Sequence, residues 1–278
     1  MEFPLVTTHW LAEHLHLENL VILDASMGKV VGKQPIVYDQ PIFIPKSQRL
    51  DLETTFCDLA SDQIHAFPTV QQFTSAAQSL GINADSLVVI YDNQGVYSSP
   101  RVWWIFQAMG FGNAFVLDGG LPQWLAENRD TVSTVAPETK HFGNIEGEAL
   151  PGRICDSQYI LERLDREQIT VLDVRAQDRF LGRAPEPRAG VRSGHIPGAL
   201  NLPFTEVLDG HGLKSPAQLT QIFDRLLVNQ PNQLIFSCGS GITACVVLLA
   251  AVIAGYQNTV LYDGSWSDWG SQPSLPIE

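Results

Sequence analysis

The residues best suited to chemistry form a loop around one cysteine. Residues 234–255 read LIFSCGSGITACVVLLAAVIAG, in which an apolar run ends at Cys238 and a second apolar run follows two glycines and a serine. This order predicts a strand, a glycine-rich loop and a helix that begins near Thr243. Parallel sheets bind ligands beyond the carboxyl ends of their strands, which is where Cys238 is expected. Backbone N–H groups of the loop and the helix N-terminus would stabilise a thiolate, the nucleophilic form of cysteine.

The remaining cysteines, Cys57, Cys155 and Cys245, are predicted to be structural, because a free cysteine is usually a buried apolar residue. Cys238 differs because glycines destabilise a segment unless a special backbone conformation is required. No CxxC or Cys/His cluster has the spacing of zinc ligands, so no metal is expected. We expect free thiols in a reducing compartment.

A second chemically promising feature is a run of arginines in an acidic protein. The chain has 17 Lys and Arg, and five of the arginines fall within residues 175–192: Arg175, Arg179, Arg183, Arg188 and Arg192. Arginine binds carboxylates and sulfonates through two parallel hydrogen bonds, so the cluster predicts a small anionic ligand. The alternative is a solvated loop of ion pairs with Asp178 and Glu186, and it applies best to Arg175 and Arg192.

His195, in the segment SGHIPGA, has two interpretations. Its imidazole could be the base that removes the proton of Cys238. We favour a ring held by backbone hydrogen bonds beside the Gly/Pro turn, because the cysteine loop can stabilise a thiolate without a base.

These segments need a fold to position them, and the chain contains two copies of one. Three pairs of segments match in the same order: VILDAS with TVLDVR, LVVIYDNQG with QLIFSCGSG, and VLDGGLPQW with LYDGSWSDW. They lie 145 to 149 positions apart, which indicates two similar domains. Asp92 occupies the position of Cys238 in the first copy. A carboxylate cannot do thiol chemistry, so the first copy is predicted to be non-catalytic.

Each copy has the pattern of an α/β domain. Apolar runs at 21–23, 87–91, 170–172 and 233–237 predict buried strands of parallel sheets, and helical patterns at 69–80, 100–109, 215–227 and 243–254 lie between them. The Pro, Gly and charged residues of 138–152 predict a linker. The predicted domains are therefore 1–137 and 153–278.

The overall composition excludes several classes of protein. A formal net charge of −13 argues against general binding to nucleic acids or anionic membranes. The apolar stretch at 244–254 is too short to span a bilayer, and the N-terminus lacks the pattern of a signal peptide. We expect a cytoplasmic protein, and a monomer, since no heptad seam or exposed apolar stripe is evident.

Several segments together resemble the two-domain rhodanese family: CGSGITA, SGHIPGALNLPF, APEPR and YDGSWSDW, with SSPRVWWIFQAMG and VLDGGLPQW in the first copy. The resemblance extends over residues 9–269. It implies tandem rhodanese-like domains, each a parallel sheet with helices on both faces, with the catalytic cysteine in the second. The loop CGSGIT is similar to that of 3-mercaptopyruvate sulfurtransferases, whereas thiosulfate sulfurtransferases usually carry basic side chains after the cysteine.

The resemblance also implies roles for individual residues. Cys238 matches the nucleophile that carries sulfur, and Arg179 and Arg188 match the pair that holds the substrate carboxylate. The loop that cradles the persulfide matches Gly239, Ser240, Gly241, Ile242 and Thr243. Ser240 is also expected to be catalytic, because its hydroxyl would act with the two arginines on the negative charge that develops in the reaction. The implied reaction moves sulfane sulfur from 3-mercaptopyruvate to a thiol acceptor, such as thioredoxin or a small thiol, or to cyanide, and releases pyruvate. It needs no metal or organic cofactor. The alternative within the family is thiosulfate:cyanide sulfurtransferase.

The first copy departs from the family pattern in the segment IFIPKSQRLDLE, where Phe43 replaces a histidine and Lys46 a glycine. We expect local rearrangement within residues 28–66.

Two other classes of function fit the cysteine loop less well. A cysteine phosphatase would need a longer loop closed by arginine, and this loop has none. A non-enzymatic sulfur carrier remains an alternative, although the chain retains the cysteine and both arginines.

Overall fold

The computed structural model describes residues 4–137, 141–164 and 166–278, so the first three positions of the expected linker, 138–140, lie outside the described residues. The chain divides into two compact units. The first unit runs to Leu59 and also contains residues 67–150 and 208–213, and the second contains residues 60–66, 151–207 and 214–278. The main division thus falls after Leu150, and two short segments belong with the other unit.

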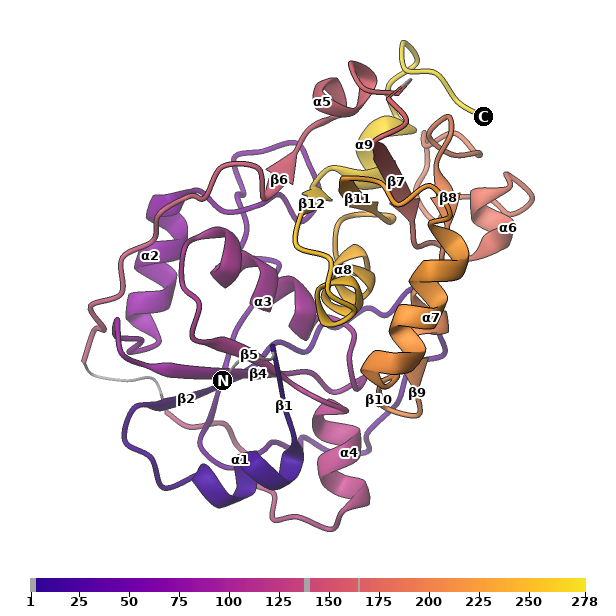
Figure 1. Ribbon diagram of the computed structural model, residues 1–278. Helices are drawn as coiled ribbons and strands as arrows, with labels where there is room; N and C mark the ends of the chain where they lie inside the picture. Colours follow the sequence, from indigo (N-terminus) through magenta and orange to yellow (C-terminus); the bar gives the residue numbers. More distant parts are fainter. Residues whose placement is uncertain (1–3, 138–140, 165) are drawn as a thin grey trace. The chain divides into compact units, whose positions relative to one another are not determined.

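The first unit contains a five-stranded parallel sheet in the order β1-β5-β4-β2-β3 (Figure 1). Its strands are β1 (Leu5–Val6), β2 (Leu20–Asp24), β3 (Ser47–Arg49), β4 (Leu87–Tyr91) and β5 (Ala114–Leu117). Its helices are α1 (Thr8–His14), α2 (Val70–Ser79), α3 (Ser99–Ala108) and α4 (Gly120–Ala126). A short antiparallel pair, β9 (Leu208–Asp209) and β10 (Gly212–Leu213), also belongs to this unit.

The second unit repeats this topology with the strand order β6-β12-β11-β7-β8, again parallel throughout. Its strands are β6 (Ile154–Cys155), β7 (Ile169–Asp173), β8 (Leu200–Asn201), β11 (Gln233–Ser237) and β12 (Thr259–Tyr262). Its helices are α5 (Ser157–Leu161), α6 (Gln177–Phe180), the 3-10 turn η1 (Phe204–Val207), α7 (Pro216–Leu226), α8 (Ala244–Ile253) and α9 (Ser265–Trp269). The predicted α/β class with parallel sheets is confirmed.

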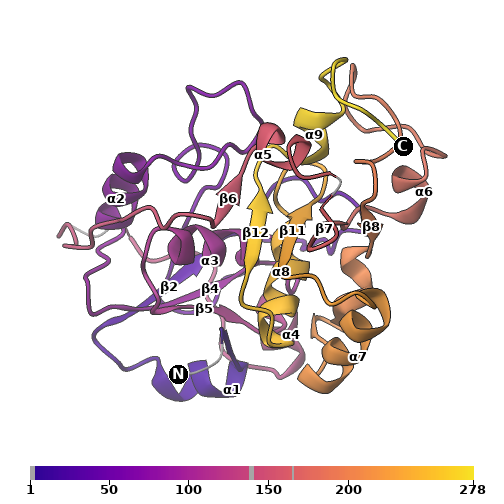
Figure 2. The ribbon, with the colours of Figure 1, turned by 45° about the horizontal axis from the view of Figure 1, so that its top comes forward.

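Helices cover both faces of the second sheet. Side chains alternate along a strand, so Ile235 of β11 packs on one face with Trp266 and Trp269 of α9. Leu234 and Phe236 point to the opposite face, where α8 packs on β11 and β12 (Figure 2). Nine of the ten residues of α8 are buried, which explains why its sequence is apolar all round.

Local capping sets where two of the predicted helices begin. Ser215 and Gln218 form a capping box at the start of α7, and Thr69 and Gln72 form another at the start of α2. Each observed helix therefore starts one residue after the polar residue that opened the predicted one.

Strand register confirms the internal repeat. Asp24 of β2 pairs with Tyr91 of β4, and Asp173 of β7 pairs with Ser237 of β11. The next residues along, Asp92 and Cys238, therefore occupy equivalent positions.

The departing segment of the first copy keeps the backbone conformation of its counterpart at Lys46. Lys46 has a φ of 66° and Gly198 a φ of 71°, so a lysine adopts the left-handed conformation that glycine has in the second unit. Phe43 pairs with Val132 as an isolated antiparallel bridge. The local difference lies before this point, because β2 leads to β3 with no helix, whereas α6 follows β7.

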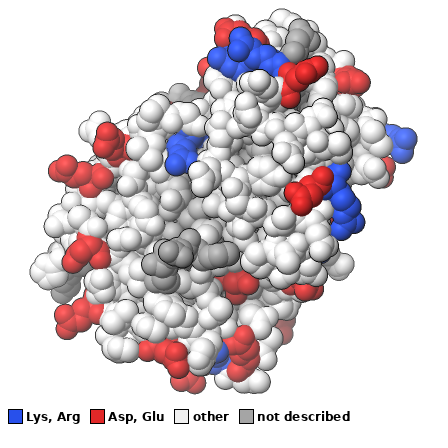
Figure 3. Space-filling view, in the orientation of Figure 1, with Lys and Arg blue, Asp and Glu red and all other residues white. Residues whose placement is uncertain are grey.

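None of the helices in the described ranges combines the length and apolar character that a membrane-spanning segment needs. On the face drawn in Figure 3, acidic side chains are scattered, and the described residues form no broad basic patch there.

Candidate active site

Cys238 lies where the sequence predicted, directly after β11 and before α8. Its side chain is buried, with 2% of the residue exposed. The connecting loop turns at Gly241, whose φ of 79° suits glycine. The predicted strand, loop and helix are confirmed, and α8 starts at Ala244, one residue later than predicted.

Helix α9 fixes the direction of the first two peptide groups of the loop. The Cys238 carbonyl accepts a hydrogen bond from Trp266 N at 3.0 Å, and the Gly239 carbonyl accepts one from Ser267 N at 2.9 Å. In a trans peptide the C=O and the following N–H point in opposite directions. Because both carbonyls point to α9, the N–H groups of Gly239 and Ser240 point away from it.

The loop presents backbone donors without protein partners. In the described part of the chain, the N–H groups of Gly239, Ser240, Ile242 and Thr243 make no hydrogen bond to protein. Cys238 N, by contrast, donates to Ser265 Oγ at 3.1 Å. Successive unpaired N–H groups at a helix N-terminus form a site suited to an anion.

A histidine that the sequence reasoning missed also contacts this loop. His65 Nδ1 lies 3.1 Å from Ser240 Oγ, and both residues belong to the second unit. His65 falls within the first repeat, in a segment without a recognisable motif, so the sequence carried no signal of its contact. Its φ of 56° shows a left-handed backbone, which is uncommon for a residue other than glycine.

Arg179 and Arg188 both approach the cysteine loop. A β-carbon placed on Gly239 would lie 3.3 Å from Arg179 Nη2 and 4.0 Å from Arg188 Nη1. The two guanidinium groups therefore converge on the residue that follows Cys238.

A buried glutamate holds Arg179 in place. Glu186, whose side chain is 4% exposed, accepts from Arg179 Nε at 3.1 Å and Arg179 Nη2 at 2.5 Å. It also accepts from Arg175 Nη1 at 2.8 Å. One carboxylate thus positions two arginines, and this double contact is not apparent in the sequence.

Arg175 and Arg192 make structural contacts, but these contacts are not the solvated ion pairs of the alternative interpretation. The side chain of Arg175 is 1% exposed and donates to both carboxylate oxygens of Asp173 and to the Gly194 carbonyl. Arg192 donates to four backbone carbonyls, those of Trp269, Gly270, Gln272 and Leu275. Arg183 is exposed. Only two of the five arginines reach the cysteine loop.

His195 is held by its backbone surroundings, which is the interpretation the sequence favoured. Its Nδ1 lies 2.9 Å from the Phe180 carbonyl, and its ring stacks on the Phe180 ring with centroids 3.8 Å apart. Its backbone N–H and C=O both bond to Glu278.

The equivalent loop of the first unit already surrounds an acidic side chain. The Asp92 carboxylate accepts hydrogen bonds from four backbone N–H groups and one hydroxyl, at 2.7 to 3.0 Å; the donors belong to Gln94, Tyr97, Ser98 and Ser99. Burial raises the pKa of Asp92, and the hydrogen bonds from Ser99, Tyr97 and Gln94 oppose that rise. Asp92 thus fills its own loop.

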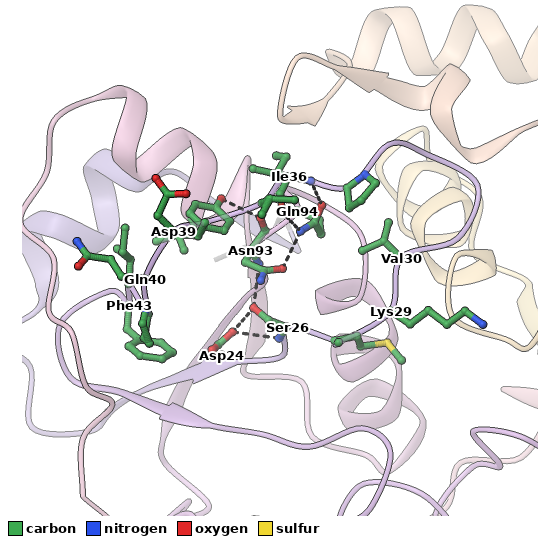
Figure 4. Close-up of a pocket in the computed structure, with 18 of the residues that line it drawn as sticks. Asp24, Ser26, Lys29, Val30, Ile36, Asp39, Gln40, Phe43, Asn93 and Gln94 are labelled. Carbon is green, nitrogen blue, oxygen red and sulfur yellow. Dashed lines mark hydrogen bonds between the residues drawn. The ribbon is translucent and has the colours of Figure 1, made fainter.

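The first unit also has a cavity of about 680 Å³ at the carboxyl edge of its sheet (Figure 4). The polar groups drawn there bond to one another: Ser26 to Asp24 and Asn93, and Gln94 to Ile36 and Asn93. Ser26 stands where the second unit has the large Arg175 side chain, two residues after the equivalent aspartate. No cysteine lines the cavity, so it offers no sulfur nucleophile.

All four cysteines are free. Burial raises the pKa of the Cys155 thiol and also that of Cys57, and Cys245 Sγ donates to the Gly241 carbonyl at 3.4 Å. The described residues contain no cluster of three or more His, Cys, Asp or Glu that could hold a metal ion.

Comparison with known proteins places this architecture in a family. The rhodanese-like domain matches residues 7–127 and again 156–272. The chain is 39% identical over 274 residues to 3-mercaptopyruvate sulfurtransferase of Rattus norvegicus, covering 95% of this chain and 91% of that protein. It is 33% identical over 296 residues to thiosulfate/3-mercaptopyruvate sulfurtransferase 1, mitochondrial, of Arabidopsis thaliana, covering 99% and 78%.

A solved structure agrees with these sequence matches. The 3-mercaptopyruvate sulfurtransferase SseA of Escherichia coli superposes with a TM-score of 0.82 at 31% identity, over 95% of this chain and 99% of that chain. The paired domain matches cover most of the sequence, and the predicted resemblance is confirmed. The chain belongs to the rhodanese family and contains two rhodanese-like domains.

Proposed function

We propose that the protein is a 3-mercaptopyruvate sulfurtransferase that uses Cys238 as its sulfur carrier. The observation that carries the proposal is the approach of Arg179 and Arg188 to Gly239, next to the cysteine. Two guanidinium groups beside a nucleophile suit a donor that carries a carboxylate. The similar proteins in rat and E. coli bear the same name.

In the first step, the Cys238 thiolate attacks the sulfur of 3-mercaptopyruvate. A bond forms between the two sulfurs, the carbon–sulfur bond breaks, and its electron pair leaves with the carbon as the enolate of pyruvate. Arg179 and Arg188 hold the carboxylate and keto oxygens, and they stabilise the negative charge that develops on the keto oxygen. The enolate then takes up a proton, which gives pyruvate.

The enzyme is left as a Cys238 persulfide. The unpaired N–H groups of residues 239, 240, 242 and 243 form the cradle for its outer sulfur. A thiolate acceptor, such as thioredoxin or a small thiol, attacks the outer sulfur, so that a new persulfide leaves and the Cys238 thiolate returns. Cyanide acts in the same way and leaves as thiocyanate.

Ser240 and His65 are assigned to proton handling in this scheme. The hydrogen bond between Ser240 Oγ and His65 Nδ1 joins a loop hydroxyl to an imidazole. A proton can pass along such a hydrogen-bonded pair to the enolate.

Thiosulfate is the alternative donor. It is a dianion without a carboxylate, and we expect it to favour a loop with cationic side chains. The Arabidopsis relative is named for both donors, so the two must be compared directly. Residues 239–243 contain no lysine or arginine, which favours mercaptopyruvate.

The remaining assignments concern the setting of the reaction. We propose that residues 153–278 form the catalytic domain, that residues 1–137, with Asp92 in place of cysteine, form a non-catalytic one, and that 138–152 link them. The four free thiols fit a reducing compartment such as the cytoplasm. We expect a monomer.

The decisive experiment measures sulfur transfer to cyanide from 3-mercaptopyruvate and from thiosulfate in parallel. Wild type should prefer 3-mercaptopyruvate, and Cys238→Ser should lose turnover with both donors. Arg188→Ala should lose the preference, whereas Arg183→Ala, an exposed arginine of the same segment, should retain it. Turnover in Cys238→Ser close to wild type would refute the mechanism, and a wild-type preference for thiosulfate would refute the choice of donor.

A further inference from the structure

Ser267 connects one arginine of the proposed donor site to the cysteine loop. Arg188 Nη1 donates to Ser267 Oγ at 3.1 Å. The same hydroxyl donates to the Gly239 carbonyl, and Ser267 N donates to that carbonyl at 2.9 Å. A single serine thus touches both the guanidinium group and the peptide that follows Cys238.

The two arginines differ in how they are held. Arg179 has the buried Glu186 carboxylate as a two-point partner. Among the described residues, Ser267 is the hydrogen-bond partner of the Arg188 side chain, and no carboxylate of these residues forms an ion pair with Arg188. Arg188 therefore keeps its charge available for a ligand, and its position depends on a neutral hydroxyl.

The first unit has no counterpart of this serine. Leu121 N bonds to the Asp92 carbonyl as Trp266 N bonds to the Cys238 carbonyl, so the next residue, Pro122, is the counterpart of Ser267. Proline has neither an N–H nor a hydroxyl to donate. The corresponding carbonyl, that of Asn93, accepts from Tyr38 Oη instead. The serine and its two donors thus occur in the unit with the cysteine.

We propose that Ser267 is a positioning residue that fixes Arg188 beside Gly239 and thereby sets the affinity for a carboxylate-bearing sulfur donor. The inference rests on the proposed function of Arg188. An arginine side chain has several rotatable bonds, and ordering it when substrate binds costs free energy. The Ser267 hydroxyl orders the guanidinium group before the substrate arrives, whereas the substrate itself holds Arg188 once the complex has formed. The effect of Ser267 therefore falls mainly on substrate binding and less on the chemical step.

The test compares steady-state kinetics of the full-length wild type with those of Ser267→Ala. With 3-mercaptopyruvate as donor and cyanide as acceptor, KM should rise about tenfold, the order expected when one hydrogen bond to a charged group is lost, while kcat changes less than about twofold. Ser267→Thr keeps the hydroxyl and should bring KM back to within about threefold of wild type. Ser271→Ala is the matched control, since Ser271 Oγ donates to the Asp268 carbonyl just beyond α9.

A double-mutant cycle separates positioning from a general structural role. If Ser267 acts through Arg188, Arg188→Ala and the Arg188→Ala/Ser267→Ala double variant should have equal KM values. A KM that stays at the wild-type value in Ser267→Ala would overturn the inference. So would effects that multiply in the double variant, because Ser267 would then act independently of Arg188. The wild-type reference decides the proposed function separately, because an enzyme inactive with 3-mercaptopyruvate refutes that function before any variant is compared.

Discussion

Replacement of Gly239 by arginine is expected to reverse the donor preference. The backbone tolerates a side chain there, because Gly239 does not have a positive φ. The new β-carbon would lie 3.3 Å from Arg179 Nη2 and 4.0 Å from Arg188 Nη1, so a third guanidinium group would enter the space between these two.

The size of the effect follows from these distances. Two unit charges 4 Å apart repel by about 4 kcal/mol at an effective dielectric of about 20. The side chain of Arg179 is 14% exposed, and solvent and ions around the site reduce the repulsion to about 1.5–2 kcal/mol. Arg179 is held by Glu186, whereas Arg188 is held by a neutral serine, so Arg188 is the residue expected to move. The ratio of kcat/KM for 3-mercaptopyruvate to that for thiosulfate should fall ten- to thirtyfold.

The assay is initial-rate sulfur transfer to cyanide with each donor, and Gly239→Met is the matched control. Methionine adds a side chain of comparable reach without charge, so it isolates the steric part of the change. The charged variant should lower the ratio further than the methionine variant. An unchanged ratio in Gly239→Arg, or an equal fall in both variants, would show that charge beside Cys238 does not select the donor.

Three further predictions concern Glu186, Asp92 and Cys155. Glu186→Gln should lower the melting temperature by about 10 °C, because breaking a buried ion pair costs about 3–5 kcal/mol, and it should also raise the KM for 3-mercaptopyruvate. The control is Glu162→Gln, which changes a carboxylate that is 56% exposed and should alter the melting temperature little in the same calorimetric scan. Asp92→Ala leaves five donors without their acceptor and should destabilise the first unit by about 3–5 kcal/mol in denaturant titration. Asp92→Asn keeps one acceptor oxygen and should lose less stability. Equal losses in the two variants would contradict the role given to the carboxylate. Because burial raises the pKa of the Cys155 thiol, Cys155 should resist iodoacetamide in the native protein at pH 8, and peptide mass spectrometry that finds it alkylated as fast as a free thiol would refute this expectation.

The elements that carry the cysteine were predictable because their signals are local. The strand at 233–237 was predicted with the bounds that β11 has, since a buried parallel strand reads as one apolar run. The repeat was equally readable, because both copies keep an aspartate at the end of the second strand and a glycine three residues after the Asp92 or Cys238 position. Those residues meet local requirements of the backbone, and such requirements restrict the residue type at a position, so they can be read from the sequence.

Side-chain pairing at long range was not predictable in the same way. The five arginines of residues 175–192 look alike in sequence, yet Arg175 is buried against Asp173 while Arg188 meets Ser267, 79 positions away. The contact between His65 and Ser240 spans 175 positions. Only the fold brings such partners together, so the sequence could suggest which arginines are structural but could not name the groups that hold each of them.

The two copies of the domain explain each other. In the first, four N–H groups and a hydroxyl converge on the Asp92 side chain, so a loop of this geometry directs several donors at one acceptor group. In the second, Ser240 N and Thr243 N are the counterparts of two of those donors, and neither has a protein partner in the described residues. A cysteine side chain ends at Sγ, whereas an aspartate side chain continues from Cγ to two oxygens. The Cys238 thiolate therefore leaves part of the loop unfilled. One added sulfur atom would bring negative charge to the donors that Asp92 satisfies in the other copy. The same backbone thus surrounds an acidic side chain in one unit and is suited to a transferable anion in the other. Within the described residues, the unit with Asp92 also lacks a counterpart of helix α6, which carries Arg179, and of Ser267, which contacts Arg188.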